Sequence, residues 1–540
     1  MKRQLCLRLT MFLTLIFLSG SLAGATFYVS KTDSGIQGAA ATDGTEKRPF
    51  STIANAVALA KAGDVILITP GVYAEPLKPK FSGTKESPIV FQATKRHGVV
   101  VTGAMALLES EANVSFITVR GIVFRDTRRD IWKINGQAHS GWKIEDCVFE
   151  GGGLDARISE DGKMRAENVT FLRVICQQTW GCGMCGQGVN GFLIKDCVIR
   201  RCNRSGERVA DCTGGSKVFN TDGCRVENLV SYDNVGAGWW FDFNNTHFEI
   251  SGGTFFGNHG VNAENQAGGI WLEKNSHGRV WNNLVYSNHG SGISIWSMED
   301  LIVEDNTFVD NLTTWWRAQG LDDKGGERLW NITMRNNRIK SWRRDAHSIS
   351  AWEIVNIKNV VIDGNVYDPP TTEAGGKPLW FWWGKDGKRL DTFSLEETRE
   401  KLGFETHGSL SKIPFDRPLF ATKAGLEVQL GKDGEQYSID ETLEKAGAKI
   451  GDVVDIPVQG RLDIQKSPEG KWFTEVYDLA RKRHVRTTIE SDEIKSAIDS
   501  EISRFAMWTP VWLKVRLSRL DEYDIQGVAA GAPHAAHTVP

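Results

Sequence analysis

A repeating pattern of apolar and polar positions fills the middle of the chain, from Val114 to Asp368. Each copy has two or three apolar or β-branched residues, a polar pair that often contains Asn, and an apolar pair, as in HFEISGGTFFGN, GRVWNNLVYSN and LIVEDNTFVDN. The copies alternate with a period of two and are rich in Gly and Asn, which indicates short strands and argues against helical repeats. The leucine framework of leucine-rich repeats is missing. The pattern therefore predicts a stack of β-strand repeats.

Two sets of asparagines mark the period of this repeat. The separations are 24, 30 and 23 residues in one set and 23, 31 and 28 in the other. A unit of about 23 residues with variable insertions fits one coil of a parallel β-helix, built from three short strands. Stacked Asn side chains inside the coils would satisfy one another's amides, so we expect an internal amide ladder. The two sets are Asn234, Asn258, Asn288 and Asn311, and Asn283, Asn306, Asn337 and Asn365.

The segments on either side of the repeats have other patterns. Residues 26–103 contain short strands and one amphipathic helix, predicted over Thr52–Ala62 and opened by Ser51. A second helix is predicted to begin at Ser394. After residue 414 the Asn phrases stop and charged helix and strand patterns replace them. We predict a C-terminal module of mixed or mostly β character over 415–526, either separate or a cap over the open strand edges, and a disordered tail over 527–540.

The first 25 residues are predicted to be a secretory signal. They combine a basic start at Lys2, Arg3 and Arg8, an apolar run too short for a membrane span, and a small-x-small cleavage site ending at Ala25. The alternative is a retained membrane anchor. Cleavage would leave Thr26 first, and the protein is expected to be secreted or periplasmic, without further attachment to the membrane. With 64 Lys+Arg against 67 Asp+Glu, nothing indicates a nucleic-acid partner.

Eight of the nine cysteines lie between Cys147 and Cys224. In an exported protein an even, clustered set predicts disulfide bonds, although the pairing cannot be deduced from the spacing. Cys182 and Cys185 form a Cys-x-x-Cys motif that could instead hold zinc or an iron–sulfur cluster. Cys147 and Cys197 recur in one phrase and could be stacked small residues of the core.

The strongest chemical signal is a phrase repeated from residue 237 to residue 311. AGWWFDFNN, AGGIWLEKN and SGISIWSMED share a hydrophobic frame, and the same position carries Asp242, Glu273 and then Trp296. Equivalent positions of neighbouring coils stack roughly 5 Å apart. Two carboxylates at that distance repel each other, so one of them holds its proton more tightly. A protonated acid beside an ionised carboxylate is what the cleavage of a glycosidic bond requires.

Tryptophan is concentrated around these acids. The stretch 239–383 holds 13 of the 19 Trp residues, and indole rings stack on the apolar faces of sugars. The alternative is that these rings only pack within the fold. We predict a carbohydrate-binding groove walled by loops after Asn258, Asn311 and Ser341. The predicted substrate-binding residues are Trp239, Trp240, Trp271, Trp296, Trp315 and Trp316, with Asn220 and Asn244 as supporting donors.

The sequence resembles a known family at two places. FYVSKTDSG followed by GTEKRPFSTIANAVALAKAGDVILITPGVY is similar to the opening of secreted right-handed parallel β-helix proteins, in which the helix caps the solenoid. GGSKVFNTDG, GAGWWFDFNN and GGIWLEKN resemble a progression found in carbohydrate-active members of this pectate-lyase-like superfamily. The resemblance covers roughly residues 26–410 and implies an all-β, right-handed parallel β-helix solenoid with an N-terminal capping helix, a domain that we predict over residues 26–414. It points to Lys217, Asp242 and Glu273 as catalytic residues.

Lys217 departs from this pattern. A coil spacing of 24 residues places Asp242 over Val218, so that Lys217 is one position out of register. It would reach the face of the two acids only if a β-bulge intervenes. The alternative is a solvated surface charge.

Three functions remain open at this point. A glycoside hydrolase would use Asp242 and Glu273 as acid and as nucleophile or base, without a metal or cofactor. A polysaccharide lyase or epimerase would use Lys217 as base, with calcium neutralising the substrate carboxylate. A secreted glycan-binding protein would use the Trp groove alone. The partner in each case is a polysaccharide or oligosaccharide, and the sequence gives no oligomeric state.

Overall fold

The computed structural model describes most of the chain between residues 24 and 535. Structural statements refer to these residues: 24–31, 42–103, 108, 113–125, 132–133, 140–157, 166–179, 181–203, 214–258, 268–288, 290–311, 313–317, 327–340, 348–352, 356–368, 379–383, 388–415, 420–421, 423–424, 427–428, 443, 446–458, 464–466, 470–478, 483–504, 511–520, 524–530 and 534–535. The predicted signal lies outside them except for Gly24 and Ala25.

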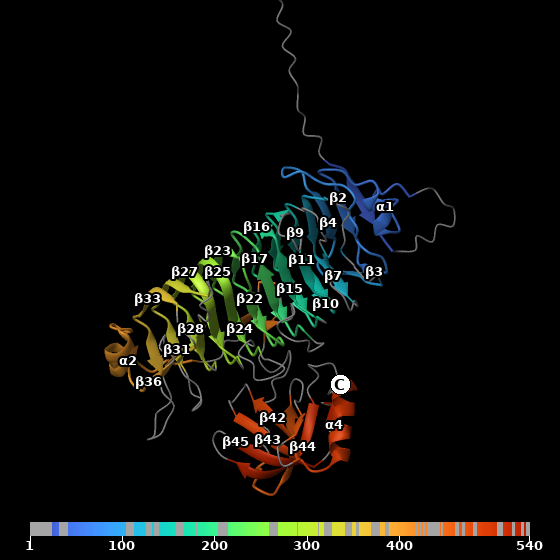
Figure 1. The fold of residues 1–540 in the computed structure, drawn as a ribbon. Coiled ribbons are helices and arrows are strands. Elements are labelled where there is room, and N and C mark those ends of the chain that lie inside the picture. The colour runs from blue at the N-terminus through green and yellow to red at the C-terminus, as the bar shows by residue number, and fades with distance from the viewer. Residues whose placement is uncertain are drawn as a thin grey trace, which may run out of the picture.

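The body of the protein is a solenoid of parallel strands, with the coils stacked one on the next (Figure 1). The predicted all-β, right-handed parallel β-helix is confirmed. A 13-stranded sheet forms one face. Its strands are β3 (Gly71–Tyr73), β5 (Val99–Val101), β7 (Ile122–Arg125), β10 (Val148–Glu150), β14 (Ile175–Gln177), β18 (Val198–Arg200), β21 (Val230–Tyr232), β24 (Thr254–Phe256), β26 (Leu284–Tyr286), β28 (Thr307–Val309), β31 (Arg338–Lys340), β34 (Val366–Asp368) and β37 (Ser409–Leu410).

A 22-stranded sheet supplies the other two faces, because two 12-residue strands run around a corner. These are β25 (Ile270–Trp281) and β27 (Ile293–Glu304), each paired with different strands along its two halves. The second face holds β1 (Thr26–Val29), β2 (Val65–Ile68), β4 (Ile89–Ala93), β6 (Ile117–Arg120), β9 (Lys143–Glu145), β13 (Thr170–Leu172), β17 (Leu193–Lys195), β20 (Arg225–Glu227), β23 (Thr246–Ser251), β30 (Leu329–Arg335) and β33 (Ile357–Asp363).

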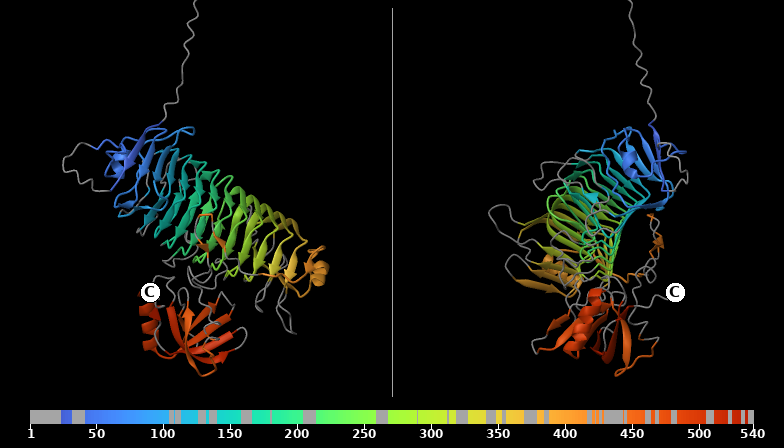
Figure 2. Two further views of the ribbon diagram at one scale, coloured as in Figure 1. Left: turned by 180° about the vertical axis from the view of Figure 1, so that it is seen from behind. Right: turned by 90° about the vertical axis from the view of Figure 1, so that its right-hand side faces the viewer.

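The third face, which we call the site face, precedes that corner in each coil. It contains the first halves of β25 and β27 together with β8 (Trp132–Lys133), β11 (Leu154–Arg157), β15 (Met184–Gln187), β19 (Ser216–Phe219), β22 (Trp239–Phe241), β29 (Thr314–Arg317), β32 (Ile349–Trp352), β35 (Trp380–Trp383) and the antiparallel β36 (Arg389–Thr392). Strands β12 (Ala166–Glu167) and β16 (Val189–Asn190) form a small additional pair. Figure 2 shows the coils from two further sides.

The predicted asparagine ladders are confirmed. Asn258 Nδ2 donates to Asn288 Oδ1 at 2.9 Å, and the backbone N–H of Asn258 donates to the same oxygen at 3.0 Å. The same two bonds join Asn283 to Asn306 in the second ladder. A third ladder, which the sequence analysis missed, joins Asn245 to Asn275. These side chains are buried, so each coil satisfies polar groups that no water reaches.

A carboxylate ends the second ladder. Glu405 is fully buried, and its two oxygens accept from the side chain and the backbone N–H of Asn365 at 2.7 and 3.1 Å. The hydroxyl of Tyr367 donates to the same carboxylate at 2.8 Å. Burial raises the pKa of Glu405, and the hydrogen bonds it accepts oppose that rise.

Short helices close the two ends of the solenoid. Helix α1 (Ile53–Val57) begins after Thr52, whose side chain accepts from the N–H of Asn55. It is shorter than the predicted helix over Thr52–Ala62, since the chain turns after Val57. At the far end α2 (Leu395–Leu402) begins after Ser394 as predicted, and it ends at Gly403 in the left-handed conformation that glycine permits.

A segment that follows the last coil returns along the outside of the 13-stranded sheet. The ring of Phe415 packs on Tyr286, with centroids 5.1 Å apart, and Ala424 joins the outer apolar cluster of this sheet. The guanidinium of Arg96 donates to the carbonyl of Ala424, and Lys423 pairs with Asp196. The residues after the solenoid are therefore held against its early coils.

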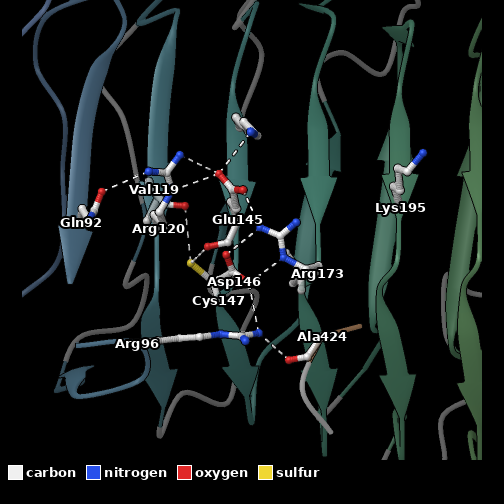
Figure 3. A network of polar contacts seen from close by, with 12 residues as sticks. Gln92, Arg96, Val119, Arg120, Glu145, Asp146, Cys147, Arg173, Lys195 and Ala424 are labelled. Carbon is white, nitrogen blue, oxygen red and sulfur yellow. Dashed lines mark hydrogen bonds and ion pairs between the residues drawn. The ribbon is translucent and has the colours of Figure 1, made fainter. Parts of the chain in front are cut away.

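Arg96 belongs to an ion network on the solenoid surface (Figure 3). Arg173 bonds both Glu145 and Asp146, and Arg120 bonds Glu145 from the other side. Burial alone would raise the pKa of Glu145, but hydrogen bonds from Lys143 and Arg120 hold it below its ordinary value. The network ties neighbouring coils together and orients the arginine that contacts the returning segment.

The C-terminal residues form a separate sheet with its own apolar core. Its seven strands are β40 (Val453–Val458), β41 (Ile464–Lys466), β42 (Trp472–Asp478), β43 (Arg483–Ile489), β44 (Val511–Leu520), β45 (Asp524–Ala529) and β46 (His534–Ala535), accompanied by α4 (Asp492–Arg504). A further pair, β38 (Phe420–Ala421) and β39 (Glu427–Val428), precedes them. The predicted mixed β character is confirmed, and the domain limits at 414/415 and 526/527 stay predictions.

The ladders lead to a prediction about stability. Asn288→Ala leaves the amide of Asn258 without its acceptor in a buried setting, so we expect the free energy of unfolding to fall by at least about 2 kcal/mol. Asn356→Ala is the control, because Asn356 only accepts a bond from Trp330 at a half-buried position where water can replace it. Urea unfolding followed by circular dichroism measures both. Equal losses in the two variants would contradict the role of the ladder.

Candidate functional site

The site face divides its side chains strictly between the interior and the outside. Val218, Phe241, Leu272 and Ile295 stack in the solenoid core. Residues one position away point outward, and there Trp240 and Trp271 form a distinct apolar cluster with the half-buried Trp296. Asp242 and Glu273 follow the two buried rings by two positions on the strands, so both carboxylates also point outward.

Lys217 lies on the same outward face as the acids. Val218 pairs with Phe241, so Lys217 neighbours Trp240 and not the interior. The register is 23 residues at this pair but 24 residues from Thr221 to Asn245. Towards the following coil, the separation between paired residues is 31 residues from Phe241 to Leu272 and 30 residues from Thr246 to Ser276.

The coil that carries Asp242 therefore has one residue more than both of its neighbours between Asp242 and Asn245. This local bulge is the feature that the uniform spacing of 24 residues could not reveal. The expected stacking of Asp242 over Val218 is wrong for this reason, because Asp242 stacks beside Phe219.

Lys217 and Asp242 form a buried ion pair. The Nζ of Lys217 lies 3.0 Å from Oδ2 of Asp242, and the two side chains are 8% and 10% exposed. The same ammonium lies 3.9 Å from the ring centroid of Trp240. A cation above an indole face is attracted by the ring quadrupole. The ammonium of Lys217 is thus held between the ring of Trp240 and the first acid.

Glu273 has the most perturbed carboxyl group of the site face. Burial, together with the negative charge of Asp242, raises the pKa of Glu273 from 4.5 to about 7. The cations Lys274 and Lys217 oppose this rise. Near neutral pH a large fraction of Glu273 therefore carries a proton. The site holds a neutral acid beside a carboxylate that is paired with a lysine.

Aromatic rings line the position of the acids. The centroids of Trp240 and Trp271 are 5.3 Å apart, and those of Trp271 and Trp296 are 6.5 Å apart. Lys274 Nζ lies 5.2 Å from the ring centroid of Trp296 and 3.8 Å from a carboxylate oxygen of Glu327. The indole Nε1 of Trp240 is buried and has no hydrogen-bond partner among the described residues.

Several predicted binding residues lie elsewhere. Trp239 and Trp316 are fully buried in the solenoid core, because they have the interior parity of their strands, and the prediction that they bind substrate is wrong. Asn220 and Asn244 lie at left-handed turns after the site-face strands, and Asn244 is exposed. The side chain of Trp315 and the loops predicted to wall the groove lie outside the described residues.

Two further residues of the site were not predicted. Lys274 lies near Trp296 and pairs with Glu327, and the charges of both influence the pKa of Glu273. Lys274 belongs to the repeated phrase but not at an outward strand position, and Glu327 lies outside the phrase. The only signal for Lys274 in the sequence is that it directly follows Glu273. Glu327 lies 54 positions after Glu273 and carries no such signal.

The expected disulfide content is realised only in part. Cys182 and Cys185 are joined by a disulfide bond. Cys147, Cys176, Cys197, Cys202 and Cys224 are buried thiols, so among the described cysteines the predicted disulfide bonding is confirmed for one pair. Cys147 and Cys197 lie in the core, as the alternative held. No group of three or more His, Cys, Asp or Glu residues within the described segments is arranged to hold a metal ion.

Comparisons with known proteins agree with the fold. Residues 132–308 and 256–387 match the family model described as right handed beta helix region, and residues 36–94 match one described as protein of unknown function (DUF1565). Together with the parallel sheets, the first match makes the chain a right-handed parallel β-helix repeat protein. A relative from Bacillus subtilis (strain 168), the uncharacterized protein YwoF, is 24% identical over 471 residues, covering 78% of this chain and 93% of that protein.

Solved structures with a similar course of the chain are distant. XylC in complex with xylose is 13% identical with a TM-score of 0.48, covering 67% of this chain and 86% of that one. The alginate lyase AlyGC of family PL6 is 14% identical with a TM-score of 0.41, covering 71% and 57%. The A-module of the Azotobacter vinelandii mannuronan C-5 epimerase AlgE4 is 16% identical with a TM-score of 0.37, covering 58% and 88%. Similarity at this level carries no argument about activity.

Within the described segments no helix has both the length and the apolar character that crossing a bilayer requires.

The geometry predicts how Glu273 titrates. Asp242→Asn removes the neighbouring negative charge and should lower the pKa of Glu273 from about 7, whereas Lys217→Met removes a positive charge and should raise it. Carbon-13 NMR of the glutamate carboxyl groups measures both shifts, with Glu273→Gln assigning the resonance. Equal shifts in one direction would contradict the proposed arrangement of charges.

The same perturbation makes the stability of the fold depend on pH. Between about 4.5 and 7 the folded protein retains a proton on Glu273 that the unfolded chain has released. The stabilisation is therefore present below pH 4.5 and is lost as the pH rises towards about 7. In Glu273→Gln this part of the pH dependence should disappear from the urea midpoint. An unchanged profile would contradict the assignment.

Proposed function

We propose that the protein is an exported carbohydrate-active enzyme whose chemistry is carried by Asp242 and Glu273 on the site face. The observation that carries this proposal is Glu273, whose pKa is raised to about 7, beside the lysine-paired Asp242, both outside the solenoid core and next to a cluster of indole rings. Solenoid packing requires apolar residues inside the coil but gives no reason for two adjacent outward acids. Indole rings beside acids suit a sugar substrate.

The reaction that this pair suits best is hydrolysis of a glycosidic bond in a polysaccharide or oligosaccharide. Glu273 is the general acid, because its pKa of about 7 leaves a proton to give to the leaving oxygen near neutral pH. Asp242 is the ionised partner, acting as nucleophile or as the base that activates water. Neighbouring coils lie about 4.8 Å apart, and carboxyl groups about 5 Å apart favour retention of configuration.

A lyase or epimerase is the second candidate, and the position of Lys217 supports it. A uronate substrate carries a carboxylate that needs a positive partner, and Lys217 is the cation that pairs with Asp242. Its ammonium is held between the carboxylate of Asp242 and the ring of Trp240, so Lys217 is placed to neutralise a substrate carboxylate beside the acids. A lyase of this kind would add calcium for the same purpose.

Turnover by the acid variants tests the hydrolase. On a polysaccharide that the purified protein cleaves, Glu273→Gln should lower kcat by about 10² to 10⁴, the usual contribution of a positioned general acid. Asp242→Asn should lower it at least as much. Reducing-end release from a panel of neutral and acidic glycans measures this. Glu299→Gln is the control, since Glu299 lies on β27, beyond the corner of the coil that follows Glu273, and pairs with Arg328.

Other outcomes separate the three functions. Full activity in both acid variants would overturn the hydrolase. An unsaturated product that absorbs in the ultraviolet and disappears with a chelator would replace it with the lyase. Glycan binding that survives both substitutions without any turnover would leave a binding protein.

A further inference from the structure

Four cysteines come together in the coils directly before Lys217. Cys182 and Cys185 form the disulfide described above, and Cys185 is the register partner of Lys217 on the neighbouring strand. Cys176 in β14 and Cys202 after β18 are buried thiols of the adjoining coils. The proposed function makes no use of these two thiols.

The two thiols meet around Gly183, the residue that follows Cys182. The Sγ of Cys176 lies 3.0 Å from the carbonyl oxygen of Gly183. The Sγ of Cys202 lies 3.9 Å from the carbonyl oxygen of Cys176, and it also interacts with the side chain of Cys176. A Cβ atom on Gly183 would come within 2.7 Å of the Cys202 sulfur. Gly183 therefore leaves the room in which the sulfurs of Cys176 and Cys202 approach each other.

We propose that Cys176 and Cys202 form a second disulfide bond in the oxidised protein. The two thiols lose two protons and two electrons as the sulfur–sulfur bond forms. A disulfide oxidant such as glutathione disulfide takes up these two protons and two electrons and becomes two thiols. Both sulfurs are buried in the finished fold, so the bond forms while the coils are assembling. The predicted export provides an environment in which such a bond persists.

The remaining described thiols differ from this pair in their surroundings. The sulfurs of Cys147 and Cys197 donate to backbone carbonyls, and burial raises the pKa of each to about 12. Burial also works against ionisation of Cys202, but hydrogen bonds with Cys176 and Thr179 bring its pKa below the ordinary value. Among these thiols, the hydrogen bond between the side chains of Cys202 and Cys176 sets this pair apart from Cys147 and Cys197.

The bond would join successive coils at a corner of the solenoid. The two cysteines are 26 residues apart, which is about one coil. Cys202 also holds the ladder position ahead of Asn234, since its backbone N–H donates to Asn234 Oδ1 at 3.0 Å. Together with the Cys182–Cys185 bond, the proposed bond would stabilise the coil that pairs with β19, the strand of Lys217.

Peptide mapping tests the pairing directly. Trypsin releases residues 174–195, which carry Cys176, Cys182 and Cys185, and residues 202–204, which carry Cys202. After refolding with glutathione disulfide and alkylation in denaturant, we expect these two peptides to be joined. Cleavage by chymotrypsin after Trp180 then separates Cys176 from the other two and should leave residues 202–204 bound to Cys176.

Thermal unfolding gives a second measurement. Cys176→Ala and Cys202→Ala should each lower the melting temperature without reductant, and the double variant should fall no further, because either change removes the same bond. In a phosphine reductant the three variants should approach the reduced wild type. Cys224→Ala, which changes another buried core thiol, is the control and should keep its difference from wild type in both conditions.

Three results would overturn the proposal. The first is alkylation of both Cys176 and Cys202 after oxidative refolding. The second is linkage of Cys202 to Cys182, Cys185 or Cys212 in the map. The third is zinc that copurifies with the chain while all four cysteines remain thiols. None of these results bears on Asp242 and Glu273, so the proposed function stands or falls separately.

Discussion

The structure depends on the stacking of one coil on the next at the spacing of hydrogen-bonded parallel strands. Each residue of a coil has a fixed neighbour about 4.8 Å away in the coil before and the coil after. A polar group inside the stack can be satisfied only by its equivalent above or below, which is what Asn258 and Asn288 do. Outside the stack the same rule places Asp242 next to Glu273 and Trp240 next to Trp271. Core, ladders and candidate site are consequences of one register.

Much of this could be predicted from the sequence, because the physical requirements repeat with the coil. Buried amides need partners, so asparagines at similar spacing predicted the ladders that the structure contains. The limits of the prediction come from single residues. The extra residue between Asp242 and Asn245 changes the register by one position, and no composition or period reveals on which side of Asp242 it lies.

Adjacent tryptophans illustrate the same limit. Trp239 and Trp240 are neighbours in the sequence, yet one packs in the core and the other faces out, since side chains alternate along a strand. The carboxylates could be paired from the repeated phrase alone. Their different states could not, because the proton on Glu273 depends on its burial and on the charges around it. Those are properties of the folded chain.

Charge on the site face is distributed unequally between two similar groups. Lys217 contacts Asp242 directly and is itself held over Trp240, so the first acid has a counter-ion at ion-pair distance. Glu273 has no described cation at that distance, and its nearest charged neighbour in sequence, Lys274, is shared with Glu327. Two acids from one repeated phrase thus differ in the charged groups that surround them.

Glu405 has a consequence for the length of the molecule. An asparagine can pass an amide chain on to another coil, because it both donates and accepts, and each member donates towards the later coil. A carboxylate receives the last two bonds and has no N–H with which to continue. The ladder therefore runs in one direction along the solenoid and ends at Glu405. A second molecule, or a duplicated coil, placed beyond Glu405 would find no amide donor there on which to extend the series.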